Sequence, residues 1–211
     1  FTFSQEYVAK DMSQVFAMNS DIKFGMDCLG ASVYEGKDRT GNDYADSEYI
    51  VWLLQMQWFK RLSFVNSSLL FKTNFQISDR PLLSLEKFSI GGVSNVRGYR
   101  ENFMTRDNSL VTTLEWRFPL FKLQIPVLSK AETDGGIELS PFFDYGMGWN
   151  TQGDNSNPKD ISSIGAGLGW HINNNIYMQI YYGYALRDIE KSGENNLQDK
   201  GIHFEISVNL F

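Results

Sequence analysis

The sequence predicts an all-β chain that forms an antiparallel transmembrane β-barrel. Three observations indicate this class: apolar residues recur at every second position, polar links separate these segments, and aromatic residues are abundant. Phe, Tyr and Trp make up 15% of the 211 residues, although the mean hydropathy is only -0.30. A membrane strand places only alternate side chains on lipid, so a barrel sequence is polar on average. Its aromatic rings gather at both membrane interfaces, which explains why a low mean hydropathy and many aromatic residues occur together.

Strand character is less regular in the first part of the chain than in the second. The segment from residue 22 sets Ile22, Phe24, Met26 and Cys28 against polar or small neighbours, and we expect Cys28 to be a small apolar strand residue. Three other segments are strand-like with weaker alternation. The expected strands in this part are residues 1–8, 22–28, 47–60 and 62–77.

The second part of the chain alternates clearly. Odd positions from Ile137 to Trp149 are apolar, whereas Glu138, Asp144 and Gly146 share the opposite face. In the later segments the face opposite the apolar residues is rich in glycine and polar side chains, which fits a lumen. The expected strands in this part are residues 110–118, 137–149, 164–172, 176–187 and 202–210.

Link lengths support a barrel, because outer-membrane barrels have short periplasmic turns and longer external loops. Short links fall at 10–13, 60–61 and 173–175, and long ones at 35–46, 78–108, 150–160 and 188–200, with 119–136 as an exception. Bacterial single-chain barrels have even strand numbers, so about nine strands indicate missing upstream strands and a portion of a larger barrel. We therefore expect residues 1–211 to belong to one barrel domain, with upstream strands outside this sequence.

Composition excludes several other classes of protein. No apolar run approaches the roughly 18 residues of a membrane-spanning helix. A net charge of -6 without a basic cluster excludes nucleic acid as the partner. No third ligand accompanies His171 and His203, so we expect no metal site and interpret both as solvated lumen residues. A soluble β-sandwich or lipocalin-like barrel stays open as an alternative fold.

The stretch from Phe88 to Leu120 carries a specific motif. Its glycine-rich part contains Gly91, Gly92, Val96, Arg97, Gly98 and Tyr99, and a strand with Glu115, Arg117 and Pro119 follows. A second motif, aromatic-x-Asp-x-Gly, lies at Phe142, Asp144 and Gly146. Together these motifs resemble those of the superfamily that contains two-partner secretion transporters (TpsB type) and outer-membrane protein insertases.

The resemblance implies the carboxy-terminal portion of a barrel of sixteen strands, with periplasmic domains outside this sequence. It also implies a long loop that folds back into the barrel lumen. We expect Arg97 to pair with Asp144, because a guanidinium contacts a carboxylate through two directional hydrogen bonds. The wall residues expected to anchor the loop are Asp144, Gly146, Phe142 and Glu115. Since the lumen is expected to be wet, the pair should affect loop position more than global stability. Glycines beside Arg97 would allow a tight turn with positive φ.

The resemblance also implies a function in the bacterial outer membrane. The leading hypothesis is a transporter that secretes a β-rich exoprotein through its lumen, with the Arg97 loop as plug or gate. Its expected partners are the secreted protein, outer-membrane lipid and the barrel assembly machinery, which reads a terminal aromatic such as Phe211. We expect no enzymatic activity and no cofactor. The alternatives are an insertase of the same superfamily and a non-transporting barrel such as an adhesin or an outer-membrane enzyme.

Overall fold

A computed structural model describes residues 1–26, 48–153, 158–187 and 197–209. Nine strands form one antiparallel sheet, in which each strand pairs with its neighbours along the chain except where a small hairpin is inserted between β4 and β7. In sheet order the strands are β1 (Thr2–Lys10), β2 (Gln14–Gly25), β3 (Tyr49–Arg61), β4 (Ser68–Ser78), β7 (Asn108–Lys122), β8 (Gly136–Trp149), β9 (Asp160–His171), β10 (Ile176–Ala185) and β11 (Ile202–Val208).

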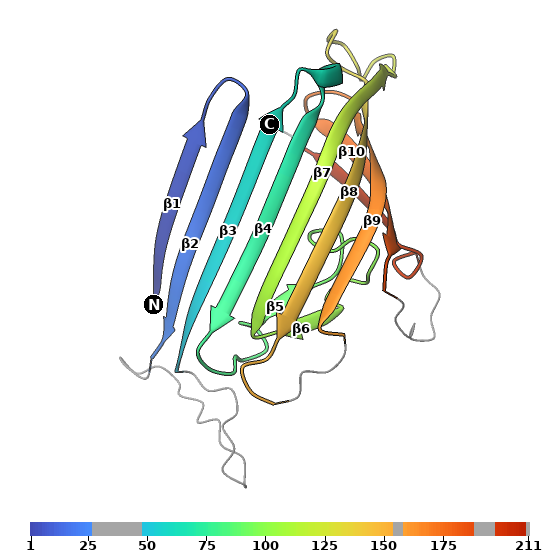
Figure 1. Cartoon of the computed structure of the whole chain (residues 1–211). Helices are drawn as coiled ribbons and strands as arrows, with labels where there is room; N and C mark the ends of the chain where they lie inside the picture. Colours follow the sequence, from blue (N-terminus) through green and yellow to red (C-terminus); the bar gives the residue numbers. More distant parts are fainter. Residues whose placement is uncertain (27–47, 154–157, 188–196, 210–211) are drawn as a thin grey trace.

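Figure 1 shows a curved sheet with the β1–β2 and β3–β4 links at one end and the link from β4 to β7, which contains β5 and β6, at the other. The prediction of an all-β antiparallel fold with about nine strands is therefore confirmed. The sheet is open in this chain, with β1 and β11 at its two edges. Within the described ranges, no helix is both long enough and apolar enough to cross a membrane.

Several predicted strand bounds were wrong. Strand β2 begins at Gln14 rather than Ile22, because the polar Ser20 interrupts the alternation on the outer face, where it accepts a hydrogen bond of 3.0 Å from Trp52 Nε1. Strand β4 begins at Ser68 rather than Leu62, because a 3-10 turn, η1 (Phe64–Asn66), precedes it. Met26 lies beyond β2, and the expectation for Cys28 lies outside the described residues.

Other bounds differ by fewer residues. Strand β7 continues past Phe118 to Lys122, so the link that was expected over 119–136 shortens to 123–135. Strands β10 and β11 end at Ala185 and Val208, before the predicted residues 187 and 210. Strand β9 spans Asp160–His171 rather than 164–172.

The two faces of the sheet differ as the alternation predicts. Apolar side chains on the outer face are largely exposed, with Phe143 and Leu168 at 44% and Phe204 at 61%. Asp144 and Ser163, which are paired across β8 and β9 on the inner face, are fully buried. A soluble sandwich would bury its apolar face, so the exposed apolar face indicates a membrane environment.

Residues 79–107, called the inner loop below, join β4 to β7 and cover part of the inner face (Figure 1). The loop contains a small hairpin of β5 (Phe88–Ile90) and β6 (Met104–Arg106), which the sequence analysis did not predict. A buried apolar cluster joins the loop to β7 and β9: Ile90, Val96, Tyr99, Met104, Val111 and Ile161. Apolar packing therefore holds the body of the loop against the sheet.

Candidate functional site

The glycine motif forms a tight turn at the tip of the inner loop. Gly91, Gly92 and Gly98 all have positive φ angles, between 92° and 109°, which glycine adopts without steric cost. Asn95 Oδ1 accepts a hydrogen bond of 2.7 Å from the backbone N–H of Gly91, and Gly92 N donates to Val96 O at 3.2 Å. This turn directs Val96 and the residues after it toward the sheet.

Arg97 lies against two carboxylates of the sheet. Its Nε and Nη2 donate to the two oxygens of Asp144 at 2.8 and 2.9 Å, and its backbone N–H donates to Asp144 Oδ2 at 3.0 Å. Its Nη1 donates to Glu115 Oε2 at 2.5 Å. The structure therefore brings Arg97, Asp144 and Glu115 together, with a two-bond contact between guanidinium and carboxylate.

This ionic cluster is buried, which corrects the expectation of a wet pair. Only 3% of Arg97, 2% of Glu115 and none of Asp144 is exposed. Burial by itself would lower the pKa of Arg97, but the hydrogen bonds and charge of Asp144 and the charge of Glu115 raise it above the ordinary arginine value. Breaking a buried pair leaves an uncompensated charge, so each partner matters more than an exposed ion pair would.

Two aromatic rings enclose the guanidinium. The Arg97 Cζ atom lies 3.5 Å from the ring centroid of Phe142 and 4.6 Å from that of Tyr181. A cation over an aromatic face is stabilised by the ring quadrupole, most strongly where water is excluded. Phe142 was among the predicted wall residues. Tyr181 was missed, although an aromatic residue on the otherwise polar face of its strand is a signal that could have indicated it.

Close backbone contacts position the loop tip on the last strands. A Cβ atom on Gly183 of β10 would lie 2.6 Å from Gly98 N, so only glycine permits this approach. The Gly98 N–H donates to His203 Nε2 of β11 at 3.3 Å. His203 is buried, so its interpretation as a solvated residue was wrong, whereas His171 is exposed and lies 3.4 Å from Glu138. Both Gly183 and the role of His203 were missed.

Residues after Arg97 add further contacts. The Tyr99 hydroxyl donates to Ser162 O at 2.9 Å, and burial raises its pKa. Arg100 forms an ion pair with Asp199, which precedes β11. Gly146 lets the apolar tip approach, because a Cβ atom there would lie 2.8 Å from Val96 Cγ2. No group of three residues suited to a metal ion occurs in the described ranges, and Phe211 lies outside them.

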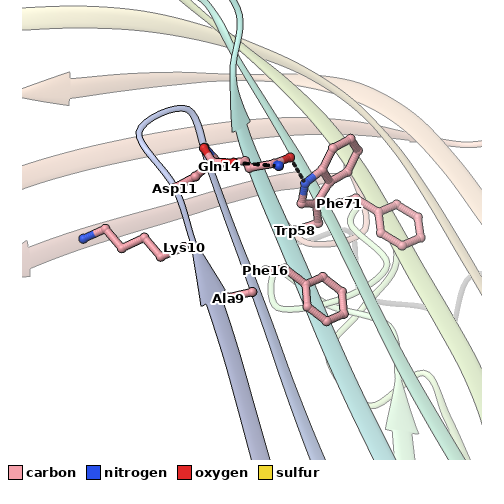
Figure 2. Close-up of a pocket in the computed structure, with 7 residues that line it drawn as sticks. All are labelled: Ala9, Lys10, Asp11, Gln14, Phe16, Trp58 and Phe71. Carbon is pink, nitrogen blue, oxygen red and sulfur yellow. Dashed lines mark hydrogen bonds between the residues drawn. The ribbon is translucent and has the colours of Figure 1, made fainter.

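A separate pocket of about 470 Å³ lies on the outer face near the short β1–β2 turn (Figure 2). Phe16, Trp58 and Phe71 line it, and Trp58 Nε1 donates to Gln14 Oε1 at 3.2 Å. Aromatic rings with a polar edge are typical of the membrane interface. Hydrogen bonds from Ser13 and Gln14 lower the pKa of Asp11 in this turn to about 2.

An antiparallel sheet with an apolar outer face and an anchored loop on its inner face defines the wall of a membrane β-barrel with an internal loop. The family model of the haemolysin secretion/activation protein ShlB/FhaC/HecB matches residues 2–172. The chain therefore belongs to this family, the TpsB type of two-partner secretion, and its place is the bacterial outer membrane.

Comparison with solved structures gives the same fold. CdiB from Escherichia coli is similar with a TM-score of 0.68 at 18% sequence identity, and the match covers 98% of this chain. The chain spans only 36% of that protein. In all, 28 chains of solved structures match. A search of curated protein sequences gave no significant match.

Proposed function

We propose that this chain forms part of an outer-membrane transporter that secretes a β-rich protein through its barrel, and that the inner loop is the gate. The observation that carries the proposal is the buried contact of Arg97 with Asp144 and Glu115 on the inner wall. The family is one of secretion proteins, which supports transport as the activity. In the whole protein, further strands would close the wall around this loop.

The contacts of the loop tip suit a gate. They are hydrogen bonds, one ion-pair cluster, glycine contacts and the apolar packing of Val96 and Tyr99, and all of these noncovalent contacts can form again after they break. A loop docked on the inner face narrows the path, so a secreted chain requires displacement of the tip. The role requires no bond chemistry and no cofactor. Lipid would cover the outer face, and the barrel assembly machinery would insert the protein.

The test is secretion by the full-length protein with Arg97→Ala. We expect less exoprotein in the medium with normal barrel assembly, because the β-strand pairing does not depend on this side chain. Arg187→Ala is the matched control, since Arg187 pairs with Asp160 at an exposed site. Heat-modifiable migration on gels reports barrel assembly.

Normal secretion from an assembled Arg97→Ala barrel with a displaced loop would exclude the gate. Levels of other outer-membrane proteins test the insertase alternative in the same cells. A fall in these levels together with normal secretion would favour insertion over transport.

A further inference from the structure

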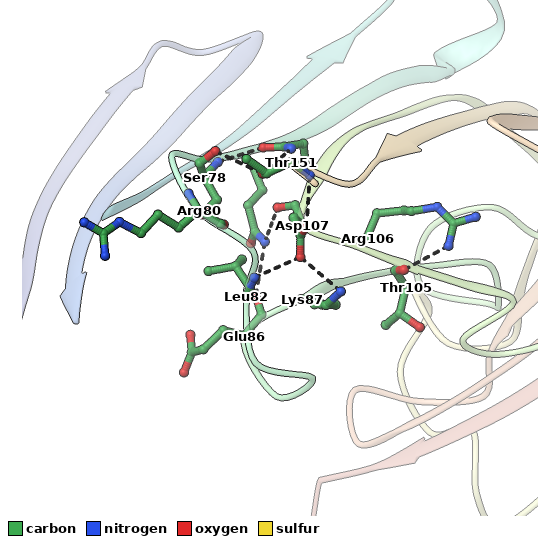
Figure 3. Close-up of polar contacts among 11 residues, drawn as sticks. Ser78, Arg80, Leu82, Glu86, Lys87, Thr105, Arg106, Asp107 and Thr151 are labelled. Carbon is green, nitrogen blue, oxygen red and sulfur yellow. Dashed lines mark hydrogen bonds and ion pairs between the residues drawn. The ribbon is translucent and has the colours of Figure 1, made fainter. Parts of the chain in front are cut away.

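The root of the inner loop is organised around one buried carboxylate. Asp107 is the last residue of the loop and is 1% exposed. Its Oδ1 accepts from Leu82 N at 3.0 Å and lies 3.1 Å from Lys87 Nζ, and its Oδ2 accepts from Thr151 N at 3.0 Å. Figure 3 shows these contacts converging from the start of the loop, its end and the segment after β8.

The neighbouring groups extend this junction to β4. Gln76 Nε2 donates to the backbone carbonyl of Asp107 at 3.0 Å. Asn108 Oδ1 accepts from Ser78 N at 2.7 Å, and Asn108 Nδ2 donates to Thr151 Oγ1 at 3.0 Å. Four chain segments therefore meet where β4 ends and β7 begins. Because backbone N–H groups supply several of the donors, the junction fixes chain positions and not only side chains.

The junction and the Arg97 cluster are far apart. Asp107 precedes β7; Thr113, which pairs with Asp144, lies six residues further along the chain, and Glu115 lies eight residues further. At about 3.3 Å per strand residue, these separations are about 20 and about 26 Å. The hydrogen bonds and the ion pair of Asp107 that are described above include none to Arg97, Glu115 or Asp144. Sites at such a distance without shared partners act independently.

We propose that Asp107 is a positioning residue that forms a second anchor, independent of Arg97, and that it fixes the root of the loop to the segment after β8. The loop tip then leaves the wall as a tethered arm, while the root stays in place. This inference rests on the proposed gate in one respect: the anchor limits the motion of the loop tip that the gate requires. The anchor itself is measurable without cargo.

The test uses thiol labelling in the full-length protein with Cys28→Ser. A membrane-impermeant maleimide reports the root through Leu82→Cys and the tip through Val96→Cys, since Leu82 is 1% exposed and Val96 is fully buried. Asp107→Asn preserves size but offers only one acceptor oxygen to two backbone donors. We expect it to raise root labelling about tenfold or more and leave tip labelling unchanged, because a hydrogen bond to a charged group is lost.

Controls separate the parts of the anchor. Lys87→Met removes only the ion pair and should raise root labelling less than Asp107→Asn does. Asp160→Asn alters an exposed carboxylate paired with Arg187 and should change neither site. Arg97→Ala should produce the opposite pattern, with faster labelling of the tip alone. If Asp107→Asn prevents barrel assembly, Lys87→Met gives the decisive comparison.

Equal acceleration at both sites in Asp107→Asn or Lys87→Met would overturn the second anchor, because the loop would then move as one unit. No acceleration at the root in either variant would overturn it as well. Secretion is measured separately in the same strains. If each variant raises labelling only at its expected site while secretion stays normal in all of them, the anchor stands and the gate is refuted.

Discussion

Replacing Arg97 by lysine tests the guanidinium geometry while the positive charge is kept. Arg97 makes three side-chain hydrogen bonds to two carboxylates, and a single ammonium at this site keeps about one of them. Each bond to a charged group contributes about 1.5–3 kcal/mol, so losing two costs about 3–6 kcal/mol. Arg117 still contacts Glu115 at 2.8 Å and offsets part of this loss. We take about 3 kcal/mol as the net cost of the substitution. This cost makes release of the loop tip roughly a hundredfold more frequent.

The assay for Arg97→Lys is the labelling rate of a thiol at the loop tip, introduced by Val96→Cys in the Cys28→Ser background. Arg187→Lys is the control, because its exposed ion pair with Asp160 contributes little and should change the rate less than about threefold. A lysine variant that labels as slowly as the parent, in an assembled barrel, would show that charge alone holds the tip. The two-bond contact would then have no special role.

Two other expectations concern the loop contact and the short turn. Gly146→Ala places a methyl group 2.6 Å from Ile90 Cγ2, so overpacking of about 1–3 kcal/mol should speed tip labelling, whereas Gly136→Ala meets open space and should not. The lowered pKa of Asp11 means that its carboxylate stabilises the β1–β2 turn above the ordinary pKa of 3.8 and loses this effect as the pH falls through about 2. Amide exchange at Ser13 and Gln14 should therefore be slower than the intrinsic rates at pH 5 and approach them as the pH falls through about 2, and equal protection at pH 2 and pH 5 would contradict the low pKa.

The faces of the strands could be predicted because alternation is a local property. Asp144 and Glu115 occupy the inner face of adjacent strands as the parity of their positions indicates. Contact between Arg97 and Asp144, which are 47 residues apart, could be expected only from the motifs. Periodicity places a side chain on a face, but it carries no information about which loop residue reaches it.

The contacts that were missed depend on the three-dimensional curvature of the sheet. Tyr181, Gly183 and His203 meet the loop tip because the curved sheet brings β10 and β11 toward it, and sheet curvature is not encoded in a two-residue period. Asp107 could not be recognised from the sequence, since it stands between Arg106 and Asn108 in a polar stretch. Its burial follows from segments that converge from separate parts of the chain.

The chemistry of the two loop ends is the reason that we expect them to behave differently. At the tip, Arg97 and Arg117 balance Glu115 and Asp144, so the four charges sum to zero in a site where Arg97, Glu115 and Asp144 are almost fully buried. Withdrawal of Arg97 removes the ion-pair partner of the buried Asp144, whose carboxylate water must then solvate, so we expect release of the tip to require the entry of water. At the root, the donors to Asp107 are mostly backbone N–H groups, which cannot leave unless the chain itself moves. We therefore expect that opening by hydration at the tip leaves the root in place.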